Sequence, residues 1–164
     1  MTDAYKTLTK GYSHKCFGCS QTNPYGLKMT FLGNQTSVVS HITVPEFMCG
    51  WSPLVHGGIL SVILDEIMSW SALHVLKKIV LTRSMTIDFI KPVSVGEALT
   101  AWAAPIKRTG RNQALVEGRI SDSRQTICAT SQGNFALLKP KTAMRLGIID
   151  ENGMNVIENI LSSG

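Results

Sequence analysis

Cysteine is scarce in this sequence, and its scarcity excludes one class of protein. The 164 residues hold only Cys16, Cys19, Cys49 and Cys128. Small secreted domains are held together by several closely spaced disulfides, whereas a chain of this length can bury a core of its own. The four thiols show no such framework. We therefore expect them to be reduced and the protein to reside in the cytoplasm.

Charge is also sparse. Charged residues make up 16% of the chain, and the net charge is +5. This excess suits a ligand with several phosphates, but it is too small and too dispersed to indicate nucleic-acid binding. The sequence shows no basic and apolar leader, and Asp65 and Glu66 interrupt its longest apolar region. We expect a soluble protein that binds neither nucleic acid nor a membrane.

The chain has no internal repeat or linker, and its length suits one domain. Residues 1–27 are polar and turn-rich, and we interpret them as a lid-like N-terminal segment. Residues 28–140 carry the regular patterns of the folded domain. Residues 141–164 form a C-terminal extension, with one short helix expected near 156–161.

Cys16 and Cys19 form a C-x-x-C pair, which raises the alternative of a zinc site. A closed structural zinc site needs four ligands, and no second cysteine pair follows at the usual spacing. The missing ligands would have to be recruited one by one from Cys49, Cys128, His14 or His41. We expect no metal and no other cofactor.

The pattern of residues 57–78 predicts one long helix that is apolar on most of its circumference. At 3.6 residues per turn, Ile59, Ile63, Ile67 and Trp70 share one side. Such a helix is buried on most sides. The exception is a narrow stripe of small or polar residues, namely Gly58, Ser61, Asp65, Ser69 and Ala72. Asp65 is therefore expected in a crevice between small neighbours.

Short alternating runs predict strands around this helix. They cover residues 28–32, 37–44, 81–90, 99–107, 113–122 and 126–138, separated by short turns that suit antiparallel neighbours. In the run at 81–90, Leu81, Met85, Ile87 and Phe89 occupy one face. An antiparallel sheet wrapped round one buried helix satisfies these elements. One such sheet leaves a sheet edge and part of the helix uncovered, which predicts a homodimer or a dimer of dimers, a homotetramer.

Several motifs occur in the order found in one family. They are GWSPLVHGGI at residues 50–59, LDE at 64–66, NPYGL at 23–27, DFIKP at 88–92 and GE at 96–97. With these motifs the sequence resembles the hotdog-fold acyl-CoA thioesterases, specifically the phenylacetyl-CoA-thioesterase-like branch, over residues 16–138. The resemblance implies an α+β hotdog fold and hydrolysis of acyl-CoA to free acid and coenzyme A.

The resemblance also implies roles for particular residues. The backbone at Gly57 polarises the thioester carbonyl, and Asp65, usually acting from the neighbouring subunit, attacks it or activates water. His56 helps shape the carbonyl pocket, and Thr82 orients water. The residues expected to bind substrate are Gly58, Arg108, Gly110 and Arg111. Taken alone, Asp65 also fits a structural carboxylate bonded to Ser61 and Ser69, and the arginines fit a solvated turn.

The neighbouring carboxylate, Glu66, also suits the role of base. It lies about 100° round the helix from Asp65 and is the fallback, although a structural role suits it too. Gly50 stands where some relatives have Asn or Gln, and Arg83 has no evident partner in its strand. The alternative functions on the same fold are a non-catalytic acyl-CoA-binding or sensing protein and a hydratase.

Overall fold

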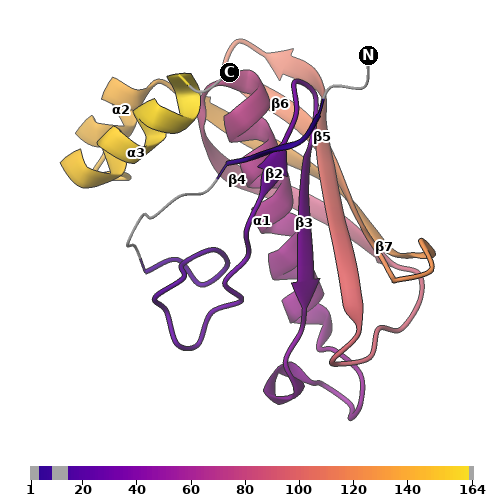
Figure 1. Cartoon of the computed structure of the whole chain (residues 1–164). Helices are drawn as coiled ribbons and strands as arrows, with labels where there is room; N and C mark the ends of the chain where they lie inside the picture. The colour runs from indigo at the N-terminus through magenta and orange to yellow at the C-terminus, as the bar shows by residue number, and fades with distance from the viewer. Residues whose placement is uncertain (1–3, 9–14, 163–164) are drawn as a thin grey trace.

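An antiparallel sheet curves round one long helix (Figure 1). This computed structural model describes residues 4–8 and 15–162. The helices are α1 (Gly57–Leu76), α2 (Pro140–Arg145) and α3 (Glu151–Ser162), with a short 3-10 helix at Glu46–Met48. The strands are β1 (Lys6–Thr7), β2 (Leu32–Gly33), β3 (Val38–Thr43), β4 (Ile79–Phe89), β5 (Ala98–Gly110), β6 (Gln113–Ser121) and β7 (Ile127–Leu138).

The strands form one sheet in the order β1-β2-β3-β5-β6-β7-β4, and every neighbouring pair is antiparallel. Helix α1 packs against β3 to β7. This is the predicted hotdog arrangement, and it confirms the expectation of a curved sheet around a central helix. Strand β4 follows directly after α1 in the chain, yet it lies at one edge of the sheet. Its outer edge therefore has no neighbour among the described residues.

Helix α1 is buried on two sides, as its apolar sequence requires. Its sheet side carries Leu64 and Met68, which are fully buried and lie against Gly118 of β6. Its other side is covered by the N-terminal segment, where Phe31 stacks on Trp70 with the ring centroids 4.7 Å apart. By length and composition alone α1 is sufficient to cross a membrane. Here it is the core helix of the sheet.

Most predicted elements are confirmed, with ends that differ by a few residues. The predicted strand at 28–32 is wrong except at its last residue, because Lys28 has a left-handed φ of 53° and the amide of Met29 bonds to the carbonyl oxygen of Gly18. Helix α2 was not predicted, although Pro140 stands at its start, where proline is favoured. The helix predicted at 156–161 is confirmed within the longer α3.

Strand β4 departs from the single alternating register expected for residues 81–90. A bulge lies between Thr82 and Ser84, so Arg83 is the extra residue. Because side chains alternate across a strand, one extra residue exchanges the two faces. Leu81 is 43% exposed and does not share the face of the partly buried Met85, while Thr82 faces α1. Arg83 is therefore the inserted residue of the bulge, which explains why its charged side chain interrupts the apolar alternation of the strand.

Candidate active site

The start of α1 is built by His56, Gly57 and Gly58. His56 is extended, with φ −62° and ψ 133°, and its Nδ1 accepts a hydrogen bond of 2.9 Å from the backbone N–H of Gly58. The imidazole thereby caps the helix and satisfies one of its first donors. A Cβ at position 58 would lie 3.0 Å from the same Nδ1. Glycine is therefore needed there for the ring to reach the backbone.

Gly57 is the first residue of α1. The N–H groups of the first helical turn have no intrahelical acceptor, and they lie at the positive end of the helix dipole. Phe89 of β4 stands next to this glycine, since a Cβ at position 57 would lie 3.6 Å from its ring. Phe89 is 55% exposed. The Gly57 N–H therefore lies beside an exposed aromatic ring and is suited to bind a carbonyl oxygen as ligand.

Asp65 lies in the middle of α1 and faces β4. The hydroxyl of Thr82 donates a hydrogen bond of 2.6 Å to its Oδ1. This contact depends on the bulge, which turns Thr82 toward the helix. The expected structural partner, Ser61, instead donates to the carbonyl oxygen of Gly57 at 2.9 Å. Asp65 is half-buried, and its second carboxylate oxygen remains available to a ligand.

One chain does not bring Gly57 and Asp65 together. They stand eight residues apart on the same helix, which is about 12 Å along the axis at about 1.5 Å per residue. Groups that act on one carbonyl must lie within hydrogen-bond distance of it, about 3 Å. Gly57 and Asp65 of one chain therefore cannot act on the same carbonyl.

Arg108, Gly110 and Arg111 lie at the turn between β5 and β6, and all three are exposed. Arg108 occupies the same cross-strand row as Thr82, three strands away, or about 14 Å at normal strand spacing. The turn lies at the opposite end of the sheet from the start of α1. Within one chain the structure thus leaves these residues apart from both Gly57 and Asp65.

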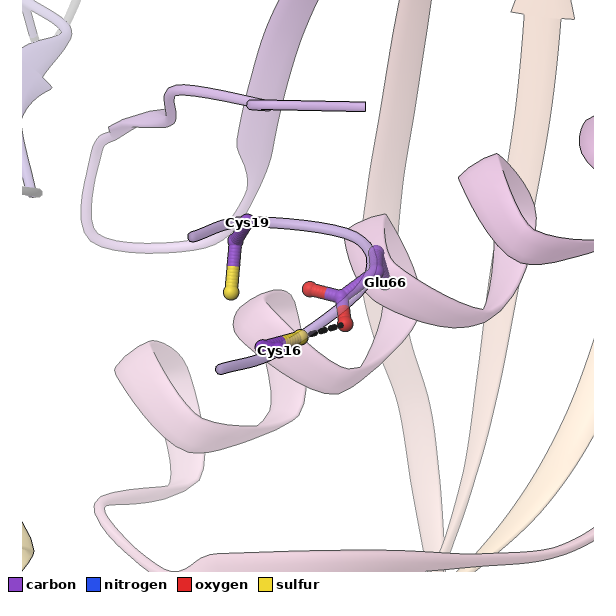
Figure 2. Close-up of side chains that lie close together, drawn as sticks. All are labelled: Cys16, Cys19 and Glu66. Carbon is purple, nitrogen blue, oxygen red and sulfur yellow. Dashed lines mark hydrogen bonds between the residues drawn. The ribbon is translucent and has the colours of Figure 1, made fainter. Parts of the chain in front are cut away.

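Glu66 faces a different partner from Asp65. The thiol of Cys16 donates a hydrogen bond of 3.0 Å to its Oε1, and the sulfur of Cys19 lies close by (Figure 2). Burial raises the pKa of Glu66 to about 8. The hydrogen bond from Cys19 lowers the pKa of Cys16, against the effect of burial, and the same bond raises the pKa of Cys19.

This cluster was missed by sequence reasoning, which treated the cysteine pair and Glu66 separately. No sequence spacing links residues 16–19 to a helix that begins at residue 57. Of the recruits considered, Cys49, Cys128 and His41 are not part of it, and His14 lies outside the described residues.

A hollow on the outer face of the sheet contains neither the Gly57 and Asp65 groups nor the thiol cluster. Gly118 faces Met68 of α1, so its neighbours Glu117 and Arg119 point outward into the hollow. Arg119 lies over the ring of Trp102, 4.0 Å from its centroid. The candidate site is therefore defined by the helix and β4, and this outer hollow does not contribute to it.

We predict that His56→Ala lowers the free energy of unfolding by about 1 kcal/mol, because the Gly58 N–H loses its capping acceptor. Urea denaturation followed by circular dichroism measures this change. His56→Asn is the matched variant, since asparagine caps helices well and should recover most of the loss. An unchanged free energy of unfolding in His56→Ala would contradict a capping role.

Parts of the sequence and the fold of this chain are similar to those of known proteins. Residues 53–129 match the sequence model of the Thioesterase superfamily. None of the curated proteins matches the chain. Among solved structures, AziG of S. sahachiroi is 23% identical with a TM-score of 0.63, over 69% of this chain and 93% of that one.

Two further structures share the fold. The E. coli PaaI protein from the phenylacetic acid degradation operon is 23% identical with a TM-score of 0.62, over 69% of this chain and 81% of that one. A hypothetical thioesterase from Streptococcus pneumoniae with coenzyme A is 18% identical with a TM-score of 0.58, over 62% and 81%. The sequence match and the common fold together lead to one conclusion: this chain has the hotdog fold, and its residues 53–129 are similar to the thioesterase superfamily.

Proposed function

We propose that the protein hydrolyses acyl-CoA thioesters to a free acid and coenzyme A. The observation that carries the proposal is the Asp65 carboxylate, held on a half-exposed helix face by the Thr82 hydroxyl at 2.6 Å. The match of residues 53–129 to the Thioesterase superfamily model and the coenzyme A bound by one structural neighbour support this substrate class.

The first half of the site is the start of α1. The thioester carbonyl oxygen accepts a hydrogen bond from the Gly57 N–H, and the positive end of the helix dipole stabilises the charge that this oxygen gains during attack. His56 does not donate to the substrate through Nδ1, because that atom already accepts from Gly58. Its role is to fix the backbone so that the Gly57 N–H points outward.

The second half is Asp65. As a general base it takes a proton from water while the water oxygen attacks the carbonyl carbon; as a nucleophile it attacks that carbon itself and water then releases the acid. In both routes the carbon–sulfur bond breaks and coenzyme A leaves as the thiol. Thr82 binds Oδ1, so the other oxygen of Asp65 is directed to the substrate.

The two halves meet only if two subunits combine. We propose a homodimer in which the outer edges of two β4 strands pair, because this edge has no neighbour among the described strands and carries the exposed Leu81 and Phe89. An antiparallel, two-fold arrangement places the start of one α1 beside the middle of the other. Gly57 of one protomer and Asp65 of the partner subunit then act on one carbonyl.

The β5–β6 turn is the proposed anchor for the coenzyme A phosphates. Arg108 and Arg111 are exposed cations on one turn, and the space around Gly110 between them is open, since a Cβ there would meet no atom within 4 Å. Arg108 shares a cross-strand row with Thr82. The pantetheine arm of coenzyme A then runs from this turn toward Asp65 of the same subunit.

Asp65→Asn should lower kcat by about 10²-fold or more while acyl-CoA still binds, because the amide keeps the size of the side chain but cannot act as base or nucleophile. Thr82→Ser should keep most activity and Thr82→Ala should lose more, since only serine preserves the hydroxyl. Thiol release from a panel of acyl-CoAs measures both. Asp88→Asn, an exposed carboxylate on β4, is the charge-matched control. Normal turnover by Asp65→Asn would refute this assignment, and acyl-CoA binding without turnover by the wild type would indicate a sensing protein.

The backbone N–H of Gly57 can be removed by a single substitution. Gly57→Pro should lower kcat by about 10²-fold to 10³-fold, because the proline ring replaces the donor. The helix should tolerate this change, since proline suits the first helical position and His56 is already extended. Gly57→Ala keeps the N–H and should lose far less.

Mixing the two defective proteins tests the shared site directly. If each site combines both subunits, Gly57→Pro mixed with Asp65→Asn restores about one quarter of wild-type activity, because half of the dimers are mixed and each mixed dimer has one intact site of two. Subunits are exchanged by mild denaturation and refolding before the assay. Mixed dimers that remain inactive would show that each chain acts alone.

Arg108→Ala combined with Arg111→Ala should raise KM for acyl-CoA more than it lowers kcat, since phosphate contacts bind substrate and transition state alike. Steady-state kinetics at low salt measure the two constants separately. Arg124→Ala, on the exposed turn at the other end of the sheet, is the control. An unchanged KM in the double variant would remove this turn from the binding site.

A further inference from the structure

Two thiols and a carboxylate converge on one point beside α1. Cys16 and Cys19 come from the N-terminal segment and Glu66 from the middle of the helix, 50 residues from Cys16 in the chain. Their ligand atoms all lie within 4.8 Å of one another. Figure 2 shows both sulfurs and the carboxylate directed into the same small space. The proposed catalytic arrangement does not use this cluster.

The backbone is shaped to bring these groups together. Gly18 lies against Glu66, since a Cβ at position 18 would be 2.1 Å from Cγ of that side chain. The turn is held from the other side, because the amides of Leu27 and Met29 bond to the carbonyl oxygens of Phe17 and Gly18 at 2.9 and 3.0 Å. Position 18 therefore has no room for any side chain while Glu66 keeps this orientation.

Besides each other and Glu66, the two sulfurs have N–H donors as neighbours. The backbone N–H groups of Gly18 and Cys19 donate toward the Cys16 sulfur, and the Trp70 indole N–H donates toward the Cys19 sulfur. An indole N–H can only donate, and its ring is fixed by stacking on Phe31. Donors of this kind around a sulfur stabilise a thiolate, and the thiolate is the form that binds metals.

We propose that Cys16, Cys19 and Glu66 bind one divalent metal ion of the zinc class. Two sulfurs and one carboxylate oxygen are a ligand set that zinc accepts, and soft thiolates disfavour magnesium and calcium. Tetrahedral ligands about 2.3 Å from an ion stand about 3.8 Å apart. Small side-chain rotations therefore place all three around one ion, with water in the fourth position.

The metal has a structural role in this arrangement. It replaces the protons that the two thiols and Glu66 hold between them, and it ties residues 16–19 to the helix at the residue next to Asp65. From the sequence no metal was expected, because no second cysteine pair follows. The third ligand is instead a carboxylate that only the fold brings near. This site does not depend on the proposed hydrolysis, so each stands or falls on its own test.

Metal titration of the whole, fully reduced protein tests the proposal. Co²⁺ should bind one ion per chain and give a thiolate-to-metal charge-transfer band with the visible bands of a tetrahedral site, and Zn²⁺ should displace it. Zn²⁺ should also raise Tm, because it binds the folded state. Mg²⁺ should do neither. A reduced protein that gives no charge-transfer band with Co²⁺ and no Tm shift with Zn²⁺ would overturn the proposal.

Matched variants locate the ion. Cys16→Ser and Cys19→Ser should abolish the charge-transfer band, and Glu66→Gln should weaken Zn²⁺ affinity by about 10²-fold while circular dichroism stays unchanged. Cys49→Ser and Cys128→Ser are the controls and should keep both the band and the affinity. A Co²⁺ spectrum that survives Cys16→Ser, or that disappears in Cys49→Ser, would place the ion elsewhere and refute this assignment.

Discussion

Burial of α1 is the constraint on which the rest of the structure depends. A helix that is apolar nearly all round cannot leave any broad face in water. The curved sheet covers one side, and the chain that leads into β2 covers another, where Phe31 stacks on Trp70. The polar groups of the helix must then find partners in whichever element lies over them. The hydrogen bonds of Asp65 and Glu66 arise where another element covers these residues of α1.

Asp65 and Glu66 show how this works. Adjacent residues on a helix point about 100° apart, so two neighbouring carboxylates face two different elements. Asp65 faces β4 and receives the Thr82 hydroxyl, whereas Glu66 faces the N-terminal segment and receives the Cys16 thiol. One carboxylate thus lies beside the edge strand β4, and the other lies among thiols, where burial raises its pKa. Their different chemistry follows from position alone.

The helix and most of the strands were predictable from the sequence because periodicity reports which face is buried. The start of α1 was predictable too, since His56, Gly57 and Gly58 form a local motif. The predictions that were wrong concern features that depend on contacts between distant parts of the chain. The bulge at Arg83 depends on how β4 pairs with β7. The expected strand at 28–32 does not form, because the amide of Met29 bonds to the carbonyl oxygen of Gly18 in a loop instead of to a neighbouring strand. Alternation in one strand does not reveal a residue inserted relative to its neighbour.

The same distinction explains why the thiol cluster was hidden while the Asp65 site was not. The roles proposed for Asp65 and Gly57 fall in one continuous stretch of sequence, residues 50–66, that carries the motifs of the resemblance. The cluster instead joins a C-x-x-C turn to a single carboxylate far along the chain, and neither part is diagnostic alone. Gly18 is the most informative residue in retrospect, because its missing side chain makes room for Glu66. A glycine inside a C-x-x-C turn thus indicates a close approach, but only the fold identifies what approaches.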